Sequence, residues 1–333
     1  MKLNKNSELK LSTIDEKEKS LRPETLKEYM GQKNLKEILS VYIKAAKKRK
    51  ESLEHLLIYG PPGLGKTTLA KIVAKELNVN FKITSGAAME RSGDLAAILS
   101  SLQIGDVLFI DEIHRLPKSI EEILYSAMED YVLDIILGSE NEKKSIRIDL
   151  PPFTLIGATT RFGDISSPLR DRFGLILKLN YYSEDELELI IKRTSLVYNT
   201  KIDNNTLKKL VKRSRGTPRI ANRLFRRIRD FADVYNKGLI DEHIAKIALE
   251  KLTIDKNGLD NTDYIYLKSL IEKFEGGPVG IKNIAANIGE EVSTIEDIYE
   301  PYLLKKGYIK RTKRGRIATS LTFKLFKNDK NKK

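Results

Sequence analysis

The sequence contains no cysteine in 333 residues. This absence excludes disulfide bonds, thiolate zinc sites and cysteine nucleophiles, and it fits a reducing compartment. No apolar run approaches the roughly 18 residues that a membrane-spanning helix needs. Residues 1–20 are polar and charged and have no apolar centre of the kind found in signal peptides. We therefore expect a soluble, cytoplasmic protein.

Acidic residues are the minority among the charged ones. The chain has 60 Lys and Arg against 46 Asp and Glu, which gives a net charge of +14. This surplus favours a polyanionic partner, with nucleic acid ahead of an anionic membrane surface. A general lysine enrichment of the proteome is the other explanation, and composition does not separate the two. The length and the 41% share of hydrophobic residues predict two or three globular domains.

Short apolar segments alternate with helical patterns over residues 20–180, which predicts a parallel α/β sheet. The segments that read as strands are "HLLIYG", "NFKITSG", "DVLFIDE" and "FTLIGATT". Residues 131–150 form two alternating arms around a polar turn, and this pattern is typical of a β-hairpin. Its arms carry the apolar residues Val132, Ile135, Ile136 and Leu137.

After residue 182 the alternation of strands and helices ends. Residues 183–252 show only helical patterns, and after residue 256 three helical patterns precede two short strands around a Lys-Arg-Gly-Arg turn. Three helices followed by a basic hairpin predict a winged helix. We expect a large α/β domain over 1–182 (with a loose leader at 1–20), a small all-helical domain over 183–253 and a winged-helix domain over 256–333, ending in a disordered tail "KNDKNKK".

The stretch "GPPGLGKT", from Gly60 to Thr67, has the full spacing of a phosphate-binding loop. Glycines let backbone N–H groups turn towards phosphates, and the following helix directs its positive end at the same anion. Lys66 is expected to reach the outer phosphates of ATP, and the Thr67 hydroxyl to ligate Mg²⁺. The loop lies between a predicted strand and a predicted helix, which is the context that the chemistry requires.

The second half of such a site is a carboxylate at the end of a buried strand. "VLFIDEIH" supplies Asp111 and Glu112, 45 residues after Lys66. We expect Asp111 to hold Mg²⁺ through water, and Glu112 to orient or deprotonate the attacking water. His114 is expected to be a polar neighbour and not a metal ligand. "GATTR" offers the hydroxyl of Thr159, or that of Thr160, as a sensor of the outer phosphate.

Arginines in two further segments are candidates for stabilising charge during phosphoryl transfer. Arg170 and Arg172 lie in "SSPLRDRFG", and Arg219 lies in "GTPRIANRLF" near the start of a predicted helix. Surface arginines are frequent, so these segments alone do not assign a role.

Together, "GPPGLGKT", "DEIHRL", "GATTR", "SPLRDRFG" and "GTPRIANRL" resemble the AAA+ ATPases, and with "LRPETLKEYMGQ" and the winged C-terminal part they resemble the RuvB family of branch-migration motors. The resemblance covers about residues 20–320. It implies a hexameric ring around duplex DNA at Holliday junctions, acting with RuvA and with the RuvC resolvase. It also implies that residues 131–150 dock RuvA.

The resemblance further implies roles for individual residues. Arg172 is the arginine finger supplied to the neighbouring subunit, with Arg170 as second choice, and Arg219 is the sensor of the helical domain. The nucleotide contacts implied by the family, including those of the phosphate loop, are Leu21, Arg22, Gly63, Leu64, Gly65, Lys66, Thr67, Thr68, Glu129, Asp130, Tyr131, Arg172, Tyr182 and Arg219.

The last part of the chain is strongly basic. Residues 301–333 contain twelve Lys or Arg and one acidic residue, Asp329. This density predicts phosphate contacts, and we expect Arg311 and Arg316 of the wing to touch the duplex backbone. The other readings of the chain are a protein-remodelling ATPase, a clamp loader and a DNA-binding regulator with an inactive nucleotide site. The segment "SGAAMERSGDLAAI" has no aromatic residue for threading polypeptide, and a winged helix is not usual in clamp loaders.

Overall fold

The computed structural model describes residues 21–137 and 144–330. The chain divides into two compact units, Met1–Tyr181 and Tyr182–Lys333. The leader expected at residues 1–20 lies outside the described residues.

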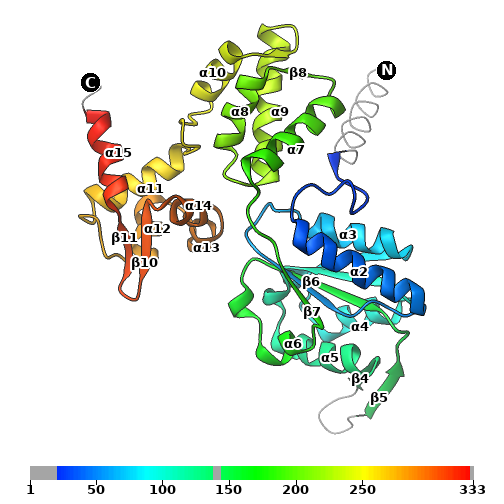
Figure 1. Cartoon of the computed structure of the whole chain (residues 1–333). Coiled ribbons are helices and arrows are strands. Elements are labelled where there is room, and N and C mark those ends of the chain that lie inside the picture. Colours follow the sequence, from blue (N-terminus) through cyan, green and yellow to red (C-terminus); the bar gives the residue numbers. More distant parts are fainter. Residues whose placement is uncertain (1–20, 138–143, 331–333) are drawn as a thin grey trace, which may run out of the picture. The chain divides into compact units, whose positions relative to one another are not determined.

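The first unit is built on a five-stranded parallel sheet with the order β2-β3-β6-β1-β7 (Figure 1). Its strands are β1 (Leu56–Tyr59), β2 (Phe81–Ser85), β3 (Val107–Asp111), β6 (Thr154–Thr159) and β7 (Leu175–Lys178). The four predicted strands are confirmed, whereas β7 was not predicted. The central strands are apolar on both faces because helices cover both sides of the sheet.

The helices of the first unit are α2 (Lys33–Arg49), α3 (Lys66–Leu77), α4 (Ser92–Ser100), α5 (Lys118–Glu129) and the short α6 (Ser167–Asp171). Figure 1 shows α2 and α3 on one face of the sheet and α4, α5 and α6 on the other. Residues of α4, α5 and α6 share a buried cluster with Leu57, Leu108 and Leu155 of the strands. The parallel α/β architecture is therefore confirmed.

His55 belongs to this core. Its Nδ1 accepts a hydrogen bond from the Leu155 amide at 2.8 Å, and its Nε2 lies 3.1 Å from the Met128 carbonyl oxygen. Burial lowers the pKa of His55, which keeps the ring neutral and able to accept the first bond. The histidine thus joins the starts of β1 and β6 to the end of α5, a structural role that the sequence did not indicate.

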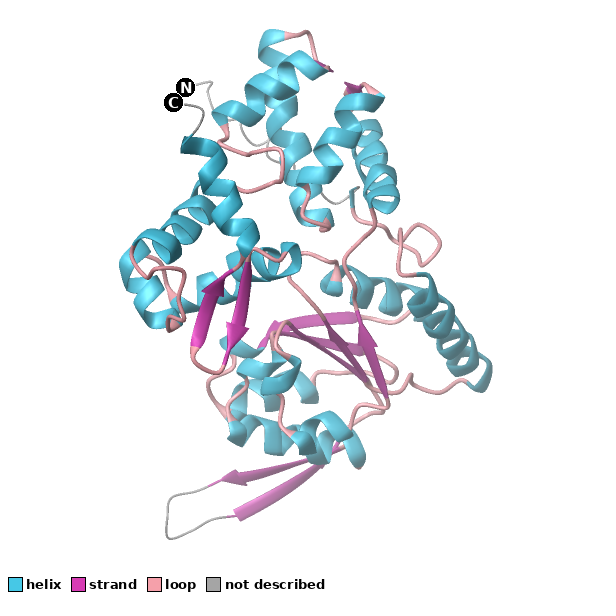
Figure 2. Ribbon diagram, turned by 60° about the vertical axis from the view of Figure 1, so that its left-hand side comes forward, coloured by secondary structure: helices cyan, strands magenta, loops and turns pink. Residues whose placement is uncertain are grey.

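The predicted hairpin is confirmed as β4 (Val132–Leu137) paired antiparallel with β5 (Lys144–Asp149). In Figure 2 it extends away from the parallel sheet of the first unit. The side chains of Val132 and Leu133 are buried at its base. Its turn, residues 138–143, and the side chains of Ile135, Ile136 and Leu137 lie outside the described part of the structure.

The second unit begins with four helices, α7 (Glu184–Val197), α8 (Asn204–Arg213), α9 (Pro218–Tyr235) and α10 (Glu242–Lys251). Side chains of Ser183, Asp203 and Asp241 cap α7, α8 and α10 at their N-termini. The prediction of helices alone was wrong in one detail. The two-residue strands β8 (Lys201–Ile202) and β9 (Leu239–Ile240) form a small parallel pair.

The rest of the second unit has the predicted winged-helix arrangement. It contains α11 (Asn261–Glu272), α12 (Ile281–Ile288), α13 (Val292–Thr294), a π-helical turn (Ile295–Tyr299), α14 (Glu300–Lys306) and the wing β10 (Ile309–Thr312) and β11 (Gly315–Ala318). A final helix, α15 (Ser320–Lys330), was not predicted. The expectation of a disordered tail is wrong for residues 327–330, which continue α15; residues 331–333 lie outside the described residues.

A buried ion pair connects the helical and winged parts of the second unit. Arg215, in the turn between α8 and α9, donates to Asp263 of α11 and, at 3.1 Å, to Asp260. The side chains of Arg215 and Asp263 are almost inaccessible to solvent. Arg215 also donates through Nε to the Gly258 carbonyl and lies over the Tyr302 ring. These contacts fix the linker between the two parts.

Replacing Arg215 by methionine should lower the free energy of unfolding by about 3–5 kcal/mol, because it leaves a buried carboxylate without its partner. Burial raises the pKa of Asp263 to about 7, so the folded chain binds this proton more tightly than the unfolded chain does. The contribution of Asp263 to the free energy of unfolding therefore falls as pH rises towards 7. The free energy of unfolding that Arg215→Met loses should be smaller at pH 5, where Asp263 is protonated, than at pH 8.

Urea denaturation at the two pH values measures this loss. Lys209→Met is the matched control, since Lys209 pairs with Glu242 on the exposed surface and should cost less than about 1 kcal/mol. Equal stability of Arg215→Met and the wild-type chain would show that the buried pair does not hold the linker.

No helix in the two described stretches combines the length and the hydropathy needed to cross a membrane.

Candidate functional site

The phosphate loop lies between the end of β1 and the start of α3, as its sequence requires. Gly60, Gly63 and Gly65 have φ values of 147°, 78° and 98°, a region that L side chains avoid. A Cβ at Gly60 would lie 2.5 Å from the Leu179 carbonyl oxygen, and one at Gly65 would lie 3.2 Å from the Tyr29 hydroxyl. The glycines therefore allow a loop conformation at the N-terminus of α3 that other residues would adopt only with strain.

Lys66 and Thr67 begin α3 beside this loop. The Lys66 ammonium is largely buried and donates to the carbonyl oxygens of Gly60 and Pro61, at 2.9 and 3.2 Å. It is thus held across the loop, where an anion bound there would meet it. The Thr67 hydroxyl lies 3.5 Å from Asp111 Oδ2, at the end of β3. A hydroxyl and a carboxylate in this arrangement form a donor set that suits Mg²⁺.

Glu112 follows Asp111 in a strained backbone conformation. Its φ of 48° lies in the left-handed region, which a non-glycine residue adopts at some energetic cost. Glu112 thereby ends β3 and begins the 3₁₀ turn Ile113–Arg115. Glu112 Oε2 accepts from the Thr160 hydroxyl at 3.2 Å and lies 3.2 Å from His114 Nδ1.

The structure distinguishes the two threonines of "GATTR". Thr159 is buried, and its hydroxyl lies 2.9 Å from His114 Nδ1 and accepts from the Arg161 amide. Thr160, one residue further, is the one whose hydroxyl reaches the Glu112 carboxylate. The geometry thus puts Thr160 in direct contact with the acidic residue, and puts Thr159 behind His114. His114 takes the position of a polar neighbour that the sequence predicted.

Residues that precede α2 contact the phosphate loop and α3. The Tyr29 hydroxyl donates to the Leu64 carbonyl at 3.3 Å, and the Leu26 amide donates to Glu76 of α3 at 3.1 Å. Leu21 and Arg22 open this segment. Tyr29 supports the phosphate loop and was missed in the sequence, where only its position within "LRPETLKEYMGQ" could have drawn attention to it.

Arg172, just after α6, is held in its own subunit by three contacts. Its Nη2 donates to Glu129 at 3.0 Å, its Nη1 donates to the Pro168 carbonyl at 2.7 Å, and the guanidinium lies 4.4 Å from the centre of the Tyr125 ring. Its Nε is buried and has no partner among the described residues. Arg170 instead bonds Ser167 and lies over Phe162. The structure therefore brings Arg172 to Glu129, at the end of α5 where Asp130 and Tyr131 follow.

Tyr182 and Arg219 belong to the second unit. The Tyr182 amide donates to the Gly216 carbonyl at 3.0 Å, and Gly216 lies three residues before Arg219 in the first turn of α9. The fold thus places these two predicted residues at the same end of the helical part.

The two predicted wing arginines are not free surface residues. Arg316 donates to Glu296 and Glu300, and its side chain is 14% exposed. Arg311 donates to Glu300 and is 45% exposed. Three other basic residues of the hairpin, Lys310, Lys313 and Arg314, are exposed and form no ion pair within the described residues.

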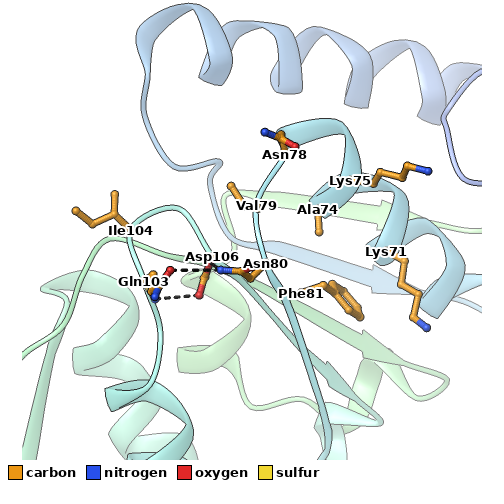
Figure 3. Close-up of a pocket in the computed structure, with 10 residues that line it drawn as sticks. All are labelled: Lys71, Ala74, Lys75, Asn78, Val79, Asn80, Phe81, Gln103, Ile104 and Asp106. Carbon is orange, nitrogen blue, oxygen red and sulfur yellow. Dashed lines mark hydrogen bonds between the residues drawn. The ribbon is translucent and has the colours of Figure 1, made fainter.

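A hollow of about 670 Å³ lies at the opposite edge of the sheet, where β2 and β3 begin (Figure 3). Asn80 donates to Asp106, another lining residue, at 2.9 Å, while Lys71 and Lys75 of α3 point away from these groups. Ligands of open parallel sheets bind at the carboxyl ends of the strands. The hollow is therefore separate from the site formed by Lys66, Asp111 and Glu112.

Comparison with known proteins identifies this arrangement. Three family models match in succession: "Holliday junction DNA helicase RuvB P-loop domain" over residues 21–179, "RuvB AAA lid domain" over 182–255 and "RuvB C-terminal winged helix domain" over 256–327. The chain is 96% identical over 330 residues to the "Holliday junction branch migration complex subunit RuvB" of Phytoplasma mali, covering 99% of both proteins. The chain belongs to the RuvB family.

Two more distant relatives agree. The subunit of the same name from Acholeplasma laidlawii is 61% identical over 315 residues, which cover 95% of this chain and 94% of the relative. A solved structure described as the Thermotoga maritima RuvB Holliday junction branch migration motor is 50% identical and superposes with a TM-score of 0.85, covering 92% of this chain and 98% of its own. Membership in the RuvB family makes the first unit a nucleotide-binding AAA+ domain, and the chain an ATPase.

Proposed function

We propose that this chain drives branch migration of Holliday junctions in DNA recombination and repair, with ATP hydrolysis as the energy source. It acts as a hexameric ring on duplex DNA, with RuvA bound through the hairpin at 131–150 and with RuvC as a further partner. Three domains, 1–182, 183–253 and 256–333, divide the work into hydrolysis, a mobile helical segment and DNA contact. The motor works in the cytoplasm.

The observation that carries this proposal is the line of groups at the carboxyl edge of the sheet. Thr67, Asp111, Glu112 and Thr160 come from three separate segments, yet the first two lie 3.5 Å apart and the last two lie 3.2 Å apart. ATP hydrolysis requires this arrangement, in which the pair that binds the metal lies beside the pair that positions and deprotonates the attacking water. A basic wing on the same chain supplies the DNA contact.

Each residue then has a defined task. The N–H groups from Gly63 to Thr68 and the Lys66 ammonium bind the phosphates, and Thr67 and Asp111 hold Mg²⁺, which neutralises charge on the phosphates when bound. Glu112 accepts a proton from the attacking water. Thr160 holds the Glu112 carboxylate and responds to the outer phosphate.

The contacts from outside the loop complete the site. Leu21 and Arg22 contact the nucleotide from the segment that Tyr29 anchors, and Tyr182 and Arg219 contact it from the helical domain. Arg172 serves the nucleotide of the neighbouring subunit, and Glu129, Asp130 and Tyr131 line the same intersubunit surface. Because Arg172 comes from another subunit, hydrolysis depends on ring assembly.

The direct test measures ATP turnover with and without duplex DNA and RuvA, together with the movement of a synthetic four-way junction. Turnover that RuvA and DNA stimulate, with junction movement, is the expected result. Turnover without movement, combined with loading of a sliding clamp or unfolding of a tagged protein, would replace the motor by one of the other AAA+ functions.

Thr160→Val should reduce the rate of hydrolysis by about 10²-fold, since removing one positioned hydrogen-bond donor from a reaction centre has an effect of this order. Nucleotide affinity should remain, because the phosphate loop is unchanged. Thr159→Val is the matched control, which alters the adjacent buried hydroxyl. A larger loss in Thr159→Val than in Thr160→Val would transfer the sensing role to Thr159.

A further inference from the structure

Glu300 is a fully buried acidic residue in the winged-helix domain, outside the nucleotide site. It is the first residue of α14, directly after the π-helical turn Ile295–Tyr299, and its side chain is 0% exposed. A buried carboxylate without compensation is strongly unfavourable, so its contacts indicate what it is for.

Both oxygens of Glu300 are fully used. Oε1 accepts from the Tyr266 hydroxyl and from Arg316 Nε, each at 2.9 Å. Oε2 accepts from Arg311 Nε at 2.7 Å and from Arg316 Nη2 at 3.3 Å. Two guanidinium groups therefore compensate one buried carboxylate.

These two arginines lie directly opposite each other on the wing, in the register Arg311↔Arg316. Like charges in this position repel and destabilise a hairpin. An isolated two-stranded hairpin is also only marginally stable. Glu300 offsets the repulsion and joins the wing to the helices, and a backbone bridge between Val279 and Arg316 adds a second connection.

The two arginines are not equivalent. Arg316 divides its donors between Glu300 and Glu296 and is 14% exposed, so it has little left for an external anion. Among the carboxylates of the described residues, Arg311 bonds Glu300 alone, and it is 45% exposed, so part of its guanidinium faces solvent. Arginine presents five donors in a rigid fork, which lets one guanidinium bind an internal carboxylate and an external phosphate together.

We propose that Glu300 is the positioning residue of the wing, which fixes Arg311 and the hairpin so that Arg311, Lys313 and Arg314 meet the phosphates of duplex DNA. Arg316 is the internal brace of this arrangement. The inference rests on the proposed function, since it takes duplex DNA as the substrate. It reverses the usual expectation for an acidic residue near DNA, because here the negative charge supports binding.

The direction in which Glu300→Gln changes DNA affinity distinguishes a positioning role from a purely repulsive one. If Glu300 acted only through its charge, Glu300→Gln would strengthen DNA binding, because a repulsive charge is removed. If Glu300 positions the wing, the same change weakens binding and reduces the number of phosphates contacted. The salt dependence reports that number, since log K falls with log [salt] by about 0.9 for each phosphate neutralised.

The experiment measures the affinity of the full-length chain for a labelled duplex over a series of salt concentrations. Glu300→Gln should weaken binding about tenfold at low salt and lower the salt slope by about one unit. Glu272→Gln removes the same charge from α11, where Glu272 pairs with Lys268, and leaves the Glu300 contacts in place. It should bind with at least the wild-type affinity and with an unchanged slope. ATP turnover without DNA should be the same in all three proteins.

Tyr266→Phe provides a second variant if Glu300→Gln does not fold. It removes only the hydroxyl that donates to Glu300, so we expect a smaller loss of affinity in the same direction. Affinity and slope equal to wild type in a folded Glu300→Gln, or in Tyr266→Phe when the former does not fold, would overturn the positioning role. If the wild-type chain binds no duplex, the proposed function fails, and the positioning role with it.

Discussion

Glu112→Gln should lower the turnover of ATP by about 10²–10⁴-fold, the range expected when a general base is lost. Glutamine keeps the size and the acceptor oxygen of glutamate, so Thr160 still has a partner, but an amide does not take a proton from water. Nucleotide binding and DNA binding should persist, because neither the phosphate loop nor the wing is altered. Measurement of turnover beside equilibrium binding of a fluorescent nucleotide checks both parts.

A matched variant shows that the effect is specific to Glu112. Glu121→Gln changes another carboxylate of the first unit, which accepts hydrogen bonds from the hydroxyls of Tyr125 and Ser166. It should leave turnover within about a factor of ten, since it only affects how α5 and α6 pack. Turnover of Glu112→Gln close to the wild-type rate would mean that another group activates the water.

Arg172→Ala should lower the rate of ATP turnover in the assembled ring by about 10³–10⁵-fold, the effect expected when an arginine finger is lost. In a single chain Arg172 bonds Glu129 and stacks on Tyr125, contacts that hold its guanidinium in one direction. Nucleotide affinity should change far less than turnover, because the finger stabilises charge that develops in the transition state.

Mixing two inactive variants tests whether Arg172 acts on the neighbouring subunit. In a mixed ring, an Arg172→Ala subunit supplies an intact site and a Glu112→Gln neighbour supplies an intact finger. About one quarter of the interfaces in an equal mixture have this combination, because each interface of a closed ring joins two different surfaces. Recovery of turnover on mixing is the expected result. Failure to recover in rings shown to be mixed would place the finger in the same subunit as the site.

Local patterns were enough to predict the elements that build the site. The phosphate loop depends on glycine spacing, and the acidic strand depends on an apolar run that ends in two carboxylates. Both signals lie within a few consecutive residues, so they can be read without knowing the fold. The hairpin at 131–150 and the wing were predicted for the same reason, since alternation and turn residues are local properties.

Contacts between distant segments could not be read in this way. Whether Thr159 or Thr160 meets Glu112 depends on how β6 pairs with β3, where Gly157 lies opposite Ile110. A shift of this pairing by one residue would turn each side chain to the other face of the sheet. The sequence therefore offered two equivalent threonines, and the strand register distinguishes them.

The wing shows the same limit. Its basic composition predicted a DNA-binding surface, but Arg311 and Arg316 looked alike in the sequence. Glu300 lies 11 and 16 residues before them, on a helix that packs beneath the hairpin. Only that packing makes Arg316 an internal brace and leaves Arg311 partly exposed.

By itself, the sequence determined the class of the chain: an α/β nucleotide-binding domain, a helical segment and a basic winged helix. The tertiary structure decided which side chain has which partner, and so which threonine contacts the Glu112 carboxylate and which wing arginine stays partly exposed. The physical reason is that backbone propensity and hydrophobic period act over a few residues, whereas ion pairs and hydrogen bonds at a site join segments that only folding brings together.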